Sequence, residues 1–310
     1  MNGRYLQHKG SPFKVARGYR WMVVVSGLQF VEDVRKASND ELSLAEASND
    51  TMNLEYTLGQ DAHHNPYHIV IIGSQLTRNL GILYPDIIDE IVTAFEEILG
   101  LQGNGELEFV VTVYRRSRLS QNIVSRTSNR IFIGLPLGRD PDRIDLTMRF
   151  TLDNIKGGVT MRLFPSFGAV SHSYMFSIQP LPFYSLVARF TTSVPASTRC
   201  GIKLLGPIIE ERRKYLDAYG KDCADKPNGF LSWLMDHPEA SESSVKDLTL
   251  RLLSINFAAI YVGLALQSFP QALYILAGNL QYMQPLRACT CVILGIQAHH
   301  ILCRTQVVVH

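Results

Sequence analysis

Three cysteines and two histidines lie close together near the end of the sequence and have the chemistry to bind a metal. They are Cys289, Cys291, His299, His300 and Cys303. Thiolate and imidazole are ligands that zinc prefers, but structural zinc sites usually pair ligands two to four residues apart on a tight turn. Here a single residue separates the first two cysteines, and an apolar run follows them. We therefore predict no metal site in this segment.

A second group of possible ligands is formed by three histidines, His63, His64 and His68. We find no carboxylate spaced so that it would complete a metal site with them. We interpret this segment as the end of a polar loop over residues 38–65, which leads into an apolar helix over residues 67–83. Pro85 is expected to start a separate amphipathic helix over residues 86–99.

Five arginines are concentrated in a predicted helix over residues 113–132: Arg115, Arg116, Arg118, Arg126 and Arg130. A surface that binds nucleic acid would interleave aromatic side chains with such cations, and this segment does not. The formal net charge of the chain is only +2, so composition adds no support for nucleic acid as a partner. We predict a solvated helix face here and no nucleic-acid partner.

The element that dominates the chain is a predicted long helix over residues 244–278. Apolar residues recur in it at alternating steps of three and four, and Ser244 stands three residues before Asp247 as a helix-start signal. From residue 252 onward both faces are apolar, so the helix must be buried on all sides. Pro270 is expected to bend or break it.

The same hydrophobicity permits a different class of protein. No charged residue occurs between Arg251 and Arg287, so residues 252–286 could form a transmembrane span in a non-catalytic membrane or interaction protein. Ser254, Asn256 and Gln267 lie near the middle of this run, where polar groups are costly in lipid. Burial in a protein core is the alternative that we favour.

Composition points to a globular protein from a reducing compartment. The chain has 310 residues, of which 46% are hydrophobic, enough for one large domain or two smaller ones. Its five cysteines are odd in number and irregularly spaced, unlike a secreted disulfide framework. Residues 1–14 have no apolar core, so we predict neither a signal peptide nor an N-terminal anchor. Residues 13–16 and 21–25 are expected to form a β-hairpin.

Several stretches, in order, resemble the cytochrome P450 monooxygenases, and among them the fungal microsomal type related to ent-kaurene oxidases. The matching stretches are residues 13–16 (FKVA), 21–27 (WMVVVSG), 63–68 (HHNPYH), 74–80 (SQLTRNL), 125–142, 205–212 (LGPIIEER), 230–236 (FLSWLMD), 247–260 and 281–287 (QYMQPLR). The resemblance implies a mainly α fold, the cytochrome P450 fold, with a small β-region near the N-terminus. It also implies that the long helix crosses the molecule beside a haem.

The family resemblance further implies a haem-thiolate monooxygenase that uses O2 and electrons from NADPH-cytochrome P450 reductase. The implied substrate is a small apolar molecule such as a terpenoid, and the implied location is the cytosolic face of the endoplasmic reticulum membrane. Without an anchor, we expect this chain to associate with membranes only weakly and to be cytoplasmic.

The resemblance also implies three cofactor-binding residues. Ala258 and Ala259 match the part of the family's long helix that lies beside the haem. Tyr261 and the residues that follow it stand where relatives carry a polar turn. The family arginine that binds a haem propionate corresponds to Gly73, which leaves Arg78 as the candidate.

Two stretches are foreign to the family, and they limit what this chain is expected to do. We interpret residues 1–287 as a partial cytochrome P450 domain that is incomplete at its C-terminal side, with a foreign insertion at 163–184 and a foreign tail at 288–310. The tail cysteines lack the glycines and phenylalanine of the family's haem-ligand loop. Glu32-x-x-Arg35 and Glu210-x-x-Arg213 are interpreted as chance matches to the family's Glu-x-x-Arg pair. We therefore predict a truncated, inactive chain with no catalytic residue of its own.

Overall fold

A computed structural model describes most of the chain as two units. The described residues are 10–17, 20–54, 58, 60–99, 113–163, 193–220, 226–240, 243–266 and short pieces between 272 and 286. Unit 1 covers residues 1–51 and unit 2 covers residues 52–310. The predicted insertion at 163–184, apart from residue 163, and the predicted tail at 288–310 lie outside the described residues.

Unit 1 contains the predicted hairpin. Strands β1 (Phe13–Arg17) and β2 (Arg20–Val24) pair antiparallel, with Phe13 opposite Val24 and Arg17 opposite Arg20. Helix α2 (Leu28–Lys36) and most of helix α3 (Leu44–Met52) follow. Of the described residues in this unit only Ser26 is buried, so unit 1 has no hydrophobic core of its own.

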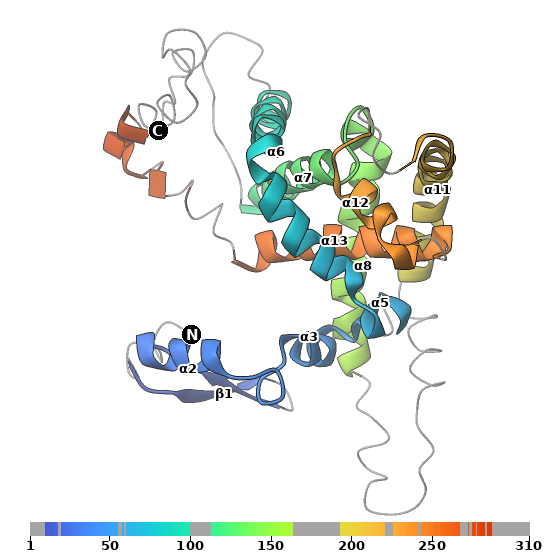
Figure 1. The fold of residues 1–310 in the computed structure, drawn as a ribbon. Helices are drawn as coiled ribbons and strands as arrows, with labels where there is room; N and C mark the ends of the chain where they lie inside the picture. Colours follow the sequence, from blue (N-terminus) through green and yellow to red (C-terminus); the bar gives the residue numbers. More distant parts are fainter. Residues whose placement is uncertain are drawn as a thin grey trace, which may run out of the picture. The chain divides into compact units, whose positions relative to one another are not determined.

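Unit 2 is built from helices. In chain order it contains α5 (Gln60–His64), α6 (Tyr67–Leu99), α7 (Val113–Phe132), η1 (Leu137–Arg139), α8 (Pro141–Leu163), α11 (Val194–Tyr219), α12 (Phe230–Asp236), η2 (Pro238–Ala240), α13 (Val245–Leu266) and η3 (Leu280–Tyr282). Helix α13 crosses the middle of this unit and packs against α7, α8 and α11 (Figure 1). The mainly α architecture with a small N-terminal β-region is the one expected of a cytochrome P450 fold.

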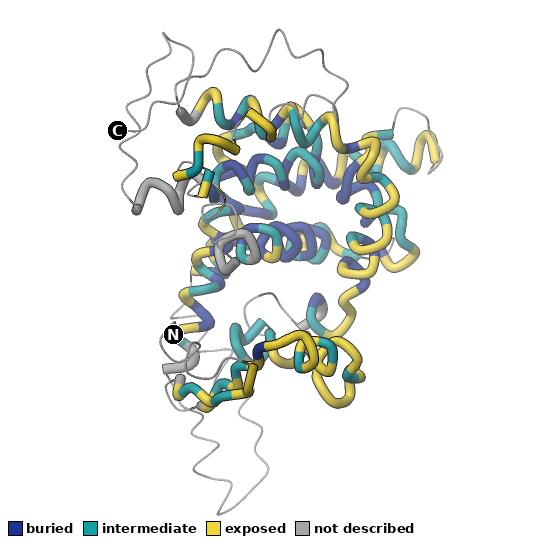
Figure 2. The backbone as a smooth tube through the Cα atoms, turned by 90° about the vertical axis from the view of Figure 1, so that its left-hand side faces the viewer, coloured by how far each residue is buried: buried dark blue, intermediate teal, exposed yellow. Residues whose placement is uncertain are grey.

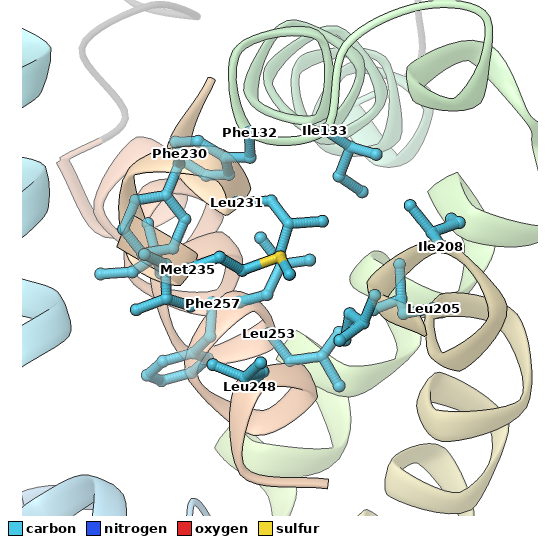
Figure 3. Close-up of a cluster of buried hydrophobic side chains, with 14 of the residues drawn as sticks. Phe132, Ile133, Leu205, Ile208, Phe230, Leu231, Met235, Leu248, Leu253 and Phe257 are labelled. Atoms are coloured by element: carbon cyan, nitrogen blue, oxygen red, sulfur yellow. The ribbon is translucent and has the colours of Figure 1, made fainter. Parts of the chain in front are cut away.

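The core of unit 2 lies around α13, in which residues 251–257 are all buried. Figure 2 shows the buried residues gathered in the interior of the helical part. Side chains from α7, α11, α12 and α13 converge there (Figure 3). Phe230 is fully buried and meets the ring of Phe132 edge-on, with centroids 5.6 Å apart. Removing this much apolar area from water is the main favourable contribution to the stability of the unit.

Gly229 lets α12 approach the end of α7. A Cβ atom at this position would lie 2.8 Å from the carbonyl oxygen of Ile131, closer than such atoms approach in proteins. The backbone of Gly229 is extended, so a side chain is excluded by space and not by backbone conformation. This close approach places Phe230, the next residue, in the core.

Two sequence predictions about helix boundaries are wrong. Residues 38–65 are not one loop, because α3 and α5 lie within them. Pro85 does not start a new helix but lies inside the continuous helix α6. Proline removes the hydrogen bond to the carbonyl four residues earlier, here that of Gly81. Both residues are exposed, so water can bind that carbonyl and the helix continues.

The predicted start of the long helix is confirmed. The backbone N–H of Asp247 donates to Ser244 Oγ over 3.1 Å, as an N-cap requires. The described helix ends at Leu266, and most of the predicted continuation to residue 278 lies outside the described residues, including Pro270.

Replacing Ser244 with alanine should lower the free energy of unfolding by about 1 kcal/mol, because one N–H of the first turn loses its acceptor. Ser244→Asp keeps an acceptor and should cost little. Urea unfolding of the three proteins measures the difference. Equal losses in both variants would mean that the cap contributes nothing.

Candidate functional site

The haem-side residues implied by the resemblance lie on a distinct part of α13. Every described residue from Leu248 to Phe257, except the half-buried Leu250, is buried, but Ala258 is exposed and Ala259 is half-buried. Both side chains are single methyl groups, so a flat apolar group could lie close to the helix backbone here. One turn further, Tyr261 stacks on Phe257 with ring centroids 5.5 Å apart.

The other predicted cofactor residue, Arg78, lies exposed on α6. It makes no ion pair with any described residue. Gly73, where the family arginine is expected, is also exposed and has open space around its Cα. Five residues along a helix correspond to a rotation of about 140°, so Arg78 and Gly73 face different directions. The role of Arg78 toward a haem propionate therefore stays a prediction from the family resemblance.

The second half of α6 carries acidic side chains that bind arginines from α7 and η1. Glu90 is completely buried, and its two carboxylate oxygens accept from Arg126 Nε at 2.8 Å and from Arg139 Nε at 2.6 Å. Arg126 also donates to Glu97 over 2.5 Å, and Arg130 donates to Asp86 over 2.6 Å. These contacts join α6 to α7 and η1 by charge-assisted hydrogen bonds, and the pair of Glu90 and Arg126 lies away from water.

This network corrects the prediction of a solvated arginine face. Arg126 and Arg130 retain only 7% and 14% of their side-chain exposure and are paired with α6. The side chains of Arg115, Arg116 and Arg118 lie outside the described residues. The missed signal was the spacing of Asp86, Glu90 and Glu97 along one face of α6, matched by arginines four residues apart on α7.

The surroundings of two other arginines in unit 2 shift their pKa values in opposite directions. The hydrogen bond to Glu90 is the main cause that raises the pKa of Arg139. Burial lowers the pKa of Arg212, whose guanidinium donates to the carbonyl of Ile133 over 2.6 Å and to Ser232 Oγ over 3.1 Å. Arg212 thereby binds a free carbonyl beyond the end of α7, where the helix dipole favours a cation.

Possible metal ligands do not form a cluster among the described residues. His63 and His64 contact each other edge-on with ring centroids 5.3 Å apart, whereas His68 is buried against α13. Cys200 is an exposed free thiol on α11. The other four cysteines and the three histidines of the tail lie outside the described residues.

The two Glu-x-x-Arg pairs are local contacts within helices. Glu32 and Arg35 form a two-pronged pair on α2 at 2.7 and 2.8 Å, and Glu210 lies 3.8 Å from Arg213 on α11. In both pairs the side chains are substantially exposed to solvent.

Within the part of the chain that the structure describes, no helix has the length and hydropathy needed to cross a membrane. The suggested span at 252–286 includes residues outside that part.

Comparison with known proteins gives a consistent set of relatives. Over 286 residues the chain is 34% identical to cytochrome P450 monooxygenase 103 of Postia placenta, an alignment that covers 91% of this chain and 52% of that protein. It is 28% identical over 286 residues to cytochrome P450 monooxygenase CYP512U6 of Ganoderma lucidum, which covers 91% and 51%. It is 30% identical over 293 residues to cytochrome P450 monooxygenase penP of Penicillium crustosum, again 91% and 51%.

The chain thus spans about half the length of the curated relatives that it matches. No family model matches the sequence.

Proposed function

We propose that the chain is part of a cytochrome P450 monooxygenase, because 91% of it aligns with one at 34% identity. We further propose that the whole protein hydroxylates a small apolar molecule with O2 and electrons from NADPH-cytochrome P450 reductase. The observation that carries this proposal is the alignment of 91% of the chain with named fungal monooxygenases. A terpenoid substrate and a relation to ent-kaurene oxidases are finer predictions that rest on the sequence resemblance alone.

In this proposal, α13 supplies one wall of the haem site. Ala258 and Ala259 would lie beside the haem, and the exposed Arg78, which pairs with no acid among the described residues, would bind a propionate. When bound, haem supplies the means of activating O2, and an axial thiolate makes it electron-rich enough to do so. The proposed location is the cytosolic face of the endoplasmic reticulum membrane.

The described residues fit a haem wall but do not fit a complete haem site. Cys200 is an exposed thiol on α11, without the enclosed, hydrogen-bonded surroundings that an axial thiolate requires. The tail cysteines lack the sequence context of the family's ligand loop. We propose that the 310-residue chain alone is inactive.

Carbon monoxide binding tests the proposed inactivity of the chain. The purified chain, reconstituted with haem, reduced and exposed to carbon monoxide, should give no absorption band of the thiolate-ligated type. The Postia placenta monooxygenase 103, prepared in the same way, is the positive control. If the chain does give the band, the claim of inactivity is wrong, and single serine replacements of Cys289, Cys291 and Cys303 would identify the ligand.

A chimaera tests the family-level function. Residues 1–287 joined to the part of monooxygenase 103 that the alignment leaves uncovered should give the thiolate band and consume NADPH in the presence of reductase. A chimaera that unfolds cooperatively, and is therefore folded, but gives no band would contradict the proposal.

A further inference from the structure

A buried arginine joins the long helix α13 to the start of α6. Arg251 retains 3% of its exposure. Its Nε donates to Asp247 Oδ2, one turn earlier, over 2.8 Å. Its Nη1 donates to the backbone carbonyl of Asn65 over 2.7 Å and lies 3.1 Å from Nδ1 of His68. A single guanidinium therefore forms hydrogen bonds both within its own helix and with the start of α6. The residues at the start of α6 lie more than 180 positions earlier in the sequence.

The ring of Tyr67 covers this guanidinium. The central carbon of the guanidinium lies 3.9 Å from the centroid of the Tyr67 ring, as a cation–π contact requires. The same ring is stacked on His237, with centroids 4.9 Å apart. Tyr67 Oη lies 3.3 Å from Ser243 Oγ, so the segment between α12 and α13 is part of the same junction.

His68 can accept from Arg251 only in its neutral form. Nδ1 faces the N–H of Arg251, so this nitrogen must carry a lone pair and Nε2 must carry the hydrogen. Protonation would place a hydrogen on Nδ1 and a second positive charge 3.1 Å from the guanidinium, in a place where His68 retains 4% of its exposure. The contact would then be repulsive.

We propose that Arg251 and His68 form a latch that positions α13 against the start of α6, and that the latch opens when His68 is protonated. The two helices carry Ala258, Ala259 and Arg78, so the latch would set the spacing between the two sides of the haem site. That role rests on the proposed function, whereas the contact itself does not. Arg251 and His68 are in this sense positioning residues.

The direction of the pH effect follows from the charged groups at the junction. Burial and then Arg251 lower the pKa of His68 from 6.5 to about 4, while Asp247 acts in the opposite direction. Other titratable groups among the described residues of the junction are Tyr67, His237 and Glu239, which accepts from the side-chain amide of Asn65. Arg213 of α11 adds a positive charge, because it donates to the carbonyl of Ser243. Below pH 6.5, His68 binds a proton when the latch is open but stays neutral, down to about pH 4, when the latch is closed. The latch should therefore weaken progressively between pH 6.5 and about 4 and be intact above this range.

Amide hydrogen exchange of the chain as it exists tests the latch without any haem. Protection of residues 67–72 and 247–253, corrected for intrinsic exchange rates, should fall about tenfold relative to residues 205–209 of α11 between pH 7 and pH 4.5. His68→Asn keeps an oxygen that can accept from Arg251 but does not titrate. In this variant the relative protection should not change over the same range, apart from any effect of Asp247 or Glu239 that both proteins share.

A second pair of variants separates the latch from an ordinary ion pair. Arg149 and Asp145 on α8 repeat the geometry of Arg251 and Asp247, four residues apart with Nε 2.7 Å from Oδ2, but Arg149 is 72% exposed. Arg251→Lys cannot make the same three polar contacts at once and should lose about tenfold in protection at the junction. Arg149→Lys should change nothing.

Two results would overturn the proposal. One is equal pH dependence of junction protection in the native chain and in His68→Asn. The other is unchanged protection in Arg251→Lys. If Arg251→Lys fails to fold, the comparison with His68→Asn still decides. Because neither measurement involves haem, the latch and the monooxygenase function can fail independently.

Discussion

Replacing Glu90 with glutamine should lower the free energy of unfolding by about 3 kcal/mol, because it removes the buried counter-ion that Arg126 and Arg139 share and leaves them only the exposed acids Glu97 and Asp89. Both carboxylate oxygens of Glu90 accept from arginines, and Arg126 is almost as deeply buried as Glu90 itself. Glutamine can offer only one oxygen and would direct its amide N–H groups at the other guanidinium. Urea unfolding followed by circular dichroism measures the loss.

A neighbouring acid provides the control for Glu90. Asp89 binds the same Arg139 over 3.0 Å but is 58% exposed. Asp89→Asn should therefore cost less than about 1 kcal/mol, as exposed ion pairs do. If Glu90→Gln is no more damaging than Asp89→Asn, burial does not control the strength of this network.

Replacing Phe230 with alanine should lower the free energy of unfolding by about 3–5 kcal/mol, because it opens a cavity where α12 meets α7 and α13. In the native chain the Phe230 ring is fully buried and contacts the ring of Phe132 (Figure 3), and the substitution removes this contact. Leu152, 38% exposed on α8, is the control, and Leu152→Ala should change stability by only about 0.5 kcal/mol. A similar cost for both substitutions would show that the described core does not determine stability.

The sequence predicted helices well where neighbouring residues alone determine them. The bounds of α7 and the cap at Ser244 were predicted from spacing and local capping chemistry, and the structure confirms both. Helix α3, within 38–65, was missed because it is short and largely exposed. An exposed helix needs no apolar face, so its sequence shows little apolar periodicity. Pro85 was misplaced because its effect depends on whether water reaches the carbonyl of Gly81.

The candidate site was less predictable because its contacts join residues that are distant in the sequence. His68 appeared to belong to a polar histidine segment, and nothing near it pointed to Arg251, whose position 183 residues later is set by the packing of α13. Arg126 likewise appeared solvated until Glu90 was placed opposite it. Arg78, Ala258 and Ala259 came from family resemblance, and their roles toward haem stay predictions.

The close approach at Gly229 also has a genetic consequence. Every missense change in its codon introduces a Cβ atom, and that atom would lie 2.8 Å from the Ile131 carbonyl oxygen. The obstacle is backbone and not the movable end of a side chain, so α12 would have to shift together with Phe230. No conservative replacement exists at this codon, which makes position 229 intolerant of mutational drift for as long as selection maintains the fold.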